Sequence, residues 1–110
     1  MMTVLELKEA LSLNEFCLGD PGAEVTGGYA GDLLSWVMCR AQAGDCWITI
    51  MSNLNVAAVA LMADAACVLL SEGVAPDAPL LEKARAQGVN LLGSHKSTFA
   101  LCAEISRLLS

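Results

Sequence analysis

Short apolar runs alternate with amphipathic stretches along this chain. The runs CWITI at 46–50 and CVLL at 67–70 carry no charge, a pattern typical of strands covered on both faces of a sheet. Shorter extended segments are predicted at 16–18, 24–29 and 90–92, and Gly27 and Gly28 weaken the second of these. The hydrophobic pattern therefore predicts four or five strands.

Helices are predicted between these strands from apolar positions three and four residues apart. The expected helices cover residues 4–11, 33–42, 53–63 or 55–63, 76–87 and 97–109. Thr3, Asp32, Asn53 or Asn55 and Ser97 are the expected N-cap residues. Pro76 and Asp77 open the fourth helix, and Gly44 and Gly88 end two of the helices. The inward stripe of helix 33–42 is expected to be Leu33, Leu34, Val37, Met38 and Ala41.

Strands that alternate with helices over short turns indicate a parallel sheet with right-handed crossovers. A chain of 110 residues is long enough for one core. We therefore expect a single α/β domain over residues 1–110, with helices on both faces of a mainly parallel sheet of four to five strands.

The segment NVAAVALMADAA at 55–66 has no charge before Asp64 and almost no polar face. An ordinary amphipathic helix is excluded by this pattern, which instead predicts a helix buried on all sides. A domain with so few strands cannot cover such a helix alone. The composition is 55% hydrophobic, which also indicates that another chain covers part of the surface. We therefore expect a homodimer formed through the apolar helices.

Charge and cysteine content exclude several classes of protein. The net charge of −6 and only six basic residues argue against a nucleic-acid partner. No apolar stretch reaches the length of a membrane span. The five cysteines form no CxxC pair and His95 is the single histidine, so we expect no metal site and no cofactor. Four of the cysteines sit among apolar residues, namely Cys39, Cys46, Cys67 and Cys102. Reduced, buried thiols in a cytoplasmic protein are the expected state.

The glycine-rich stretch VTGGYAGDLL at 25–34 raises the question of a phosphate-binding loop. It matches neither GxGxxG nor GxxxxGK[ST], and no lysine follows it. An acidic Asp32 at the start of a helix would also oppose a phosphate there. A strand-to-helix turn is the favoured interpretation.

Polar residues follow the predicted strands, at the edge where α/β folds bind ligands. These candidate ligand residues are Gly31, Asp32, Ser52, Asn53, Asn55, Ser71, Glu72, Gly73, Ser94 and His95. Each has an alternative structural role: the serines and asparagines as caps, and Glu72 as a solvated turn carboxylate. No nucleophile stands in an arrangement that His95 would activate, so no catalytic residue is expected.

The series GDLLSWVM at 31–38, GDCWITI at 44–50, NVAAVALMADAACVLLSEGV at 55–74 and KSTFALCAEI at 96–105 resembles the DRTGG domain family. These domains are similar to the N-terminal domain of HPr kinase/phosphorylase. They also occur beside CBS domains in regulatory pyrophosphatases and next to phosphotransacetylase regions. The family's Asp-Arg pair would fall near Ser52 and Asn53 and its Thr-Gly-Gly near residues 71–73, where Gly73 alone is retained.

The resemblance implies a small α/β module with no catalysis of its own, because the kinase machinery of HPr kinase lies in a separate P-loop domain. We therefore expect a regulatory, ligand-sensing or scaffolding module that binds a nucleotide-like or phosphorylated molecule at the strand ends. One alternative is an interaction subunit that docks on a metabolic or redox enzyme without a ligand. The other is an enzyme of the serine kinase-like kind.

Overall fold

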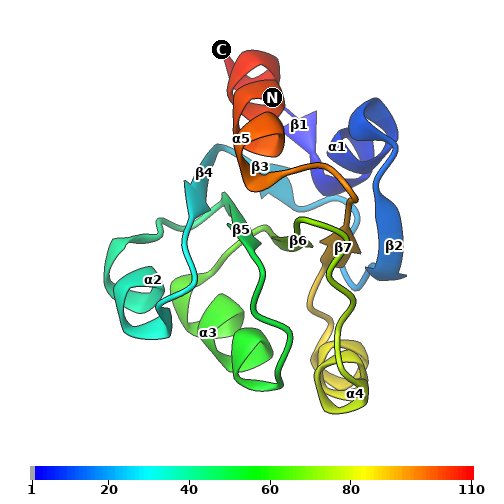
Figure 1. Cartoon of the computed structure of the whole chain (residues 1–110), viewed down its shortest axis with the longest axis vertical. Helices are drawn as coiled ribbons and strands as arrows, with labels where there is room; N and C mark the ends of the chain where they lie inside the picture. The colour runs from blue at the N-terminus through cyan, green and yellow to red at the C-terminus, as the bar shows by residue number, and fades with distance from the viewer. Residues whose placement is uncertain (1) are drawn as a thin grey trace.

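The computed structural model describes residues 2–110 and has three layers (Figure 1). In this described part, a five-stranded sheet with the order β2-β7-β6-β5-β4 forms the middle layer. Its strands are β2 (Asn14–Cys17), β4 (Gly27–Ala30), β5 (Asp45–Thr49), β6 (Cys67–Leu70) and β7 (Leu91–Gly93). Strands β4 to β7 run parallel, and β2 pairs antiparallel with β7. The expected mainly parallel α/β sheet is confirmed.

Two sets of helices cover the two faces of the sheet (Figure 1). On one face, α2 (Leu34–Arg40), α3 (Asn55–Ala63) and α4 (Ala78–Gln87) pack on the strand side chains Trp47, Val68, Leu70 and Leu91. On the other face, α1 (Val4–Leu11) and α5 (Thr98–Leu109) pack on Cys46, Ile48, Cys67, Leu69 and Leu92. Alternate residues of β5 and β6 thus enter opposite cores, as the pleat of a strand requires.

Several end signals act as the sequence predicts. The Thr3 hydroxyl accepts the Glu6 N–H at 3.1 Å, and the Glu6 carboxylate accepts the Thr3 N–H at 2.9 Å, a reciprocal capping box for α1. Asp77 caps α4 through the Leu80 N–H at 2.9 Å. Ser97 caps α5 through the Ala100 N–H at 3.1 Å. Gly88 ends α4 with a φ of 70°.

The predicted ends of the second helix are wrong. Helix α2 begins at Leu34, and the residue at its N-cap is Leu33, whose side chain forms no capping bond. It ends at Arg40, with Ala41 as the C-cap, so Gly44 does not close it. Gly44 instead adopts a φ of 86° in the turn that enters β5. The helix is only seven residues long, so its inward face is narrow. Val37 is buried, whereas Leu33 and Met38 are 58% and 43% exposed.

The predicted strand at 24–29 is interrupted at Thr26. Its first part, β3 (Glu24–Val25), pairs antiparallel with β1 (Met2–Thr3) in a small separate sheet. Its second part is β4 of the main sheet. The Thr26 N–H donates to the Gly44 carbonyl at 2.9 Å, which holds the chain at the point where it passes from one sheet to the other.

Helix α3 is covered on one side within the described chain. Its buried residues are Val56, Ala57, Val59 and Ala60. Leu61 and Met62 on the outer side are 46% and 69% exposed. The chain itself therefore does not bury this helix all round, because α2 and α4 reach only its flanks. Coverage of the outer side by a second subunit stays a prediction.

Candidate functional site

The four polar segments chosen from the sequence follow the carboxyl ends of β4, β5, β6 and β7, so they share one edge of the sheet. We call this the carboxyl edge. The structure shows what each side chain does there. Most of them form hydrogen bonds that join one loop to the next.

Asp32 joins the loop after β4 to the end of β5. Its Oδ1 accepts the Thr49 hydroxyl at 2.8 Å and the Ile50 N–H at 3.0 Å. The carbonyl of Gly31 accepts the indole N–H of Trp47 at 2.9 Å. These bonds replace the predicted helix cap and give Asp32 a structural role between β4 and β5.

The residues around Ser52 shape the entry into α3. The side-chain oxygen of Asn53 accepts the Asn55 N–H at 2.9 Å, and the Ser52 carbonyl accepts the Asp77 N–H at 3.0 Å. Asn55 is already the first helical residue and Leu54 occupies the N-cap. Asn53 thus orders the turn before the helix, which favours the structural role over ligand contact.

The segment Ser71, Glu72 and Gly73 holds the start of α5. The Ser71 and Thr98 hydroxyls lie 2.6 Å apart, and Glu72 Oε2 accepts the Thr98 N–H at 3.0 Å. A carboxylate at this position also offsets the positive end of the helix dipole. Glu72 is therefore an exposed turn carboxylate with a structural role, and ligand contact by this residue stays a prediction.

A tight turn places His95 against this segment. Glu72 and Gly73 both have positive φ, at 61° and 75°. A Cβ at position 73 would lie 2.9 Å from His95 Nδ1, so only glycine leaves room for the imidazole as it stands. The Gly73 N–H donates to the Ser94 carbonyl at 2.9 Å and fixes the two turns together.

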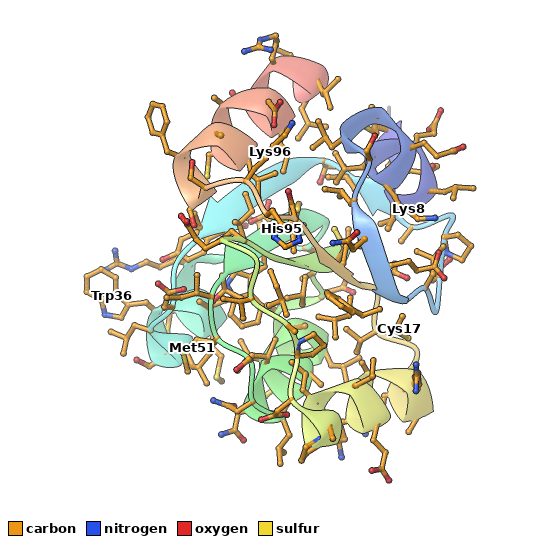
Figure 2. The ribbon with its side chains drawn as sticks, turned by 45° about the vertical axis from the view of Figure 1, so that its right-hand side comes forward. Lys8, Cys17, Trp36, Met51, His95 and Lys96 are labelled. Carbon is orange, nitrogen blue, oxygen red and sulfur yellow. The ribbon has the colours of Figure 1, made fainter. Side chains whose placement is uncertain are left out.

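Ser94 and His95 are the two predicted residues that line a hollow, a cavity of about 360 Å³. We call it the α5 cavity. Its other lining residues are Ala10, Leu11, Ser12, Asn14, Lys96 and Glu104. Figure 2 shows His95 and Lys96 near each other, between α5 and β2. The cavity thus lies where the end of β7, the start of β2 and one side of α5 meet.

Glu104 is the side chain that sets the polarity of the α5 cavity. Its Oε1 binds Lys96 Nζ at 2.8 Å. Its Oε2 is buried and has no hydrogen-bond partner among residues 2–110. Sequence reasoning missed Glu104, Lys96 and Asn14. Asn14 lies far along the chain from Lys96 and Glu104, and only the packing of α5 beside the α1–β2 loop brings the three together.

The cysteines are structural where they are buried. Cys46 and Cys67 are opposite each other on β5 and β6. The hydrogen bond between their thiols, followed by burial, raises the pKa of Cys46 well above its usual range, so the thiol stays protonated. Cys39 is exposed, which corrects the expectation that apolar neighbours bury it.

Over residues 2–110 no three His, Cys, Asp or Glu side chains gather in a way that could hold a metal ion. No helix in the same range combines the length and apolar character needed to cross a bilayer.

No protein-family model matches the sequence, and no curated protein matches it. Among solved structures, the fold is similar to the CBS and DRTGG domains of the regulatory region of the Clostridium perfringens pyrophosphatase, complexed with its activator diadenosine tetraphosphate. The TM-score is 0.68 at 15% sequence identity, over 94% of this chain and 44% of that one. This chain therefore shares its fold with less than half of that solved chain.

Proposed function

We propose that this chain is a non-catalytic regulatory module that senses a small polar ligand in the α5 cavity. The observation that carries the proposal is the buried, unpartnered Oε2 of Glu104 beside Lys96 and His95. A buried acceptor without a donor is unfavourable by about 1–3 kcal/mol. A ligand N–H or O–H would remove that penalty once the Glu104 side chain turns Oε2 toward the cavity.

The charges around the cavity favour a ligand with one anionic group. Lys96 Nζ has further N–H donors beyond its bond to Glu104, and the exposed His95 imidazole lies beside it. A single phosphate or carboxylate fits these groups, while a polyphosphate would meet the Glu104 carboxylate. A nucleoside monophosphate or a small phosphorylated metabolite is therefore the favoured ligand class. The fold shared with a nucleotide-regulated region supports the same role.

A thermal-shift assay tests this function with AMP, inorganic phosphate and diadenosine tetraphosphate as probes. A ligand at about 100 times its Kd stabilises a protein by about 2.7 kcal/mol, which raises the Tm of a domain this size by several degrees. Lys96→Gln should abolish the shift and Lys83→Gln, on exposed α4 surface, should retain it. No shift with any probe, or equal shifts in both variants, would contradict the proposal.

A second candidate function is docking on a partner enzyme without a ligand. Exposed apolar side chains on α2 and α3 favour it, among them Trp36 at 50% and Met62 at 69% exposure. Figure 2 shows Trp36 projecting from the side of the molecule opposite Lys8 and Cys17. Affinity capture from native lysate should then recover one enzyme with the wild type and lose it with Met62→Ser. Recovery of the chain alone would oppose this function.

A further inference from the structure

Strand β4 forms an edge of the sheet without the usual protection. Within residues 2–110 it pairs with β5 alone, and Figure 1 shows it at the opposite end of the sheet from β2. An edge strand presents unpaired N–H and C=O groups, which proteins normally guard with charge or proline. The four residues GGYA of β4 contain neither. This backbone is therefore ready to pair with another strand.

A groove runs beside this edge, between β4 and α5. It has a volume of about 370 Å³, and its lining includes Gly28, Ala30, Cys102, Ile105 and Leu109. The groove exists because positions 28 and 30 carry almost no side chain under the helix. Its walls are mainly apolar, and an apolar side chain is what would fill it.

Phe99 supplies such a side chain on the same surface. It is 84% exposed, the highest value among the exposed large apolar residues. Positions 99, 102 and 106 are three and seven residues apart, so they share one side of α5. Cys102 and Ser106 line the groove. Phe99 therefore stands on the groove side of the helix, one turn before the groove begins.

We propose that a second copy of this chain pairs antiparallel with β4, in place of the α3 contact expected from the sequence, and that each copy places its Phe99 in the groove of the other. Helix α5 starts near the carboxyl edge, and Leu109 ends it beside Thr26 at the start of β4. A twofold axis through the middle of β4 therefore brings the start of one α5 beside the end of the other. The partner's Phe99 then faces Ile105 and Leu109.

The spacing of the elements fits this arrangement. Paired strands lie about 4.8 Å apart, and α5 lies over β4 and β5. The two copies of α5 would then be about 10 Å apart, which is near the 8–10 Å at which helices pack. The two sheets would join into one.

The surface favours a second copy over other partners. A strand edge with a projecting ring and a groove on one face is self-complementary, as a twofold interface requires. The chain has a net charge of −6, yet β4 and the groove-side residues 99, 102, 103 and 106 carry no charge. Two copies can meet here without bringing their carboxylates together, and a basic partner finds no carboxylate to bind.

Sedimentation equilibrium at 1–100 μM (about the range in which weak dimers dissociate) tests the proposal with two matched variants. Phe99→Ser and Met62→Ser each remove one exposed apolar side chain, from α5 and from α3. We expect a wild-type dimer, a Kd raised at least ~10-fold by Phe99→Ser, and no change with Met62→Ser. Circular dichroism melts should show both variants folded.

A wild-type monomer throughout this range would overturn the proposal. So would dissociation by Met62→Ser with Phe99→Ser unaffected, since the dimer would then form through the α3 face. The interface is independent of the ligand proposal, because Glu104 lies on the other side of α5. Phe99→Ser should therefore keep any ligand-induced Tm shift, and each idea can fail alone.

Discussion

The two outer strands of the sheet, β2 and β4, differ in almost every property that controls pairing with a further strand. At β2, Glu15 forms an ion pair with Lys8 of α1 at 3.1 Å, and the strand runs antiparallel to its neighbour. At β4 there is no charge, two of the four residues are glycine, and the flanking groove is apolar. The charge on β2 disfavours pairing with a further strand, so we call β2 the guarded edge. Strand β4 carries no such charge, so we call it the open edge.

The carboxyl edge, the α5 cavity and the β4 edge also differ in how many of their polar groups are hydrogen-bonded within the chain. The polar groups of the carboxyl edge are largely used within the chain, as Asp32 and Glu72 illustrate. The α5 cavity retains an unused carboxylate oxygen, and the β4 edge retains unused backbone groups. The proposed ligand site and the proposed dimer surface thus lie on opposite sides of one helix, α5.

The largest expected effect concerns the strand that holds β4 in place. Trp47 is fully buried in β5 and bonds the Gly31 carbonyl after β4. Trp47→Ala should lower the free energy of unfolding by about 3–5 kcal/mol, measured by urea denaturation. Trp36→Ala is the matched control: its ring is half exposed and contacts the Arg40 guanidinium at 3.7 Å, a contact worth about 0.5–1 kcal/mol. Similar losses in both variants would contradict the conclusion that the buried Trp47 holds β4 against β5.

A charge placed on the open edge should make it resemble the guarded one. Ala30 is exposed on β4, so Ala30→Lys should fold normally. A lysine at this end of β4 puts a charged side chain into the uncharged interface, and we expect the dimer Kd to rise about 10–100-fold by sedimentation. Glu15→Gln on β2 should leave the Kd unchanged. A dimer insensitive to Ala30→Lys, or weakened by Glu15→Gln, would show that the edges were assigned the wrong way round.

Asp32 should matter for stability as a connection between β4 and β5. Asp32→Ala leaves the Thr49 hydroxyl, which is 1% exposed, and the Ile50 N–H without their acceptor. The expected loss is about 1–3 kcal/mol of unfolding free energy. Asp32→Asn retains an acceptor oxygen and should recover most of it. If Asp32→Ala and Asp32→Asn lower the unfolding free energy equally, an acceptor oxygen alone does not explain the stabilisation by Asp32.

The smallest effect belongs to the guarded edge itself. The side chains of Lys8 and Glu15 are 27% and 45% exposed, so solvent and salt screen their attraction. Glu15→Gln should therefore change the unfolding free energy by about 0.2–1 kcal/mol in low salt and by less in high salt. A loss of several kcal/mol that persists in high salt would mean that β2 depends on this pair for its place in the sheet.

Features set by neighbouring residues were predictable from the sequence. The strand CVLL at 67–70, the Ser97 cap, the opening of a helix at Asp77 and the Gly88 helix end all depend on local backbone chemistry, and all are confirmed. The alternation of strands and helices likewise fixed the parallel core. The stacking of Trp36 and Arg40, one helical turn apart, was predictable for the same reason.

Features set by distant contacts were not predictable. Asp32 precedes a helix and looks like its cap, but β5 lies close enough to offer it Thr49 and Ile50 instead. The α5 cavity needs Asn14, Lys96 and Glu104 from three separate elements. The open edge depends on strand order, because GGYA could equally be an interior strand until the sheet is assembled.

Amide hydrogen exchange of the wild-type chain at low and high concentration tests the central claim most directly, because it reads both sheet edges in one sample. The account predicts that exchange of the β4 amides, Gly27 to Ala30, slows as the concentration rises through the dimer Kd, while exchange of the outward β2 amides does not change. Exchange at β4 that stays fast at every concentration, or slowing at β2 or α3 instead, would contradict it.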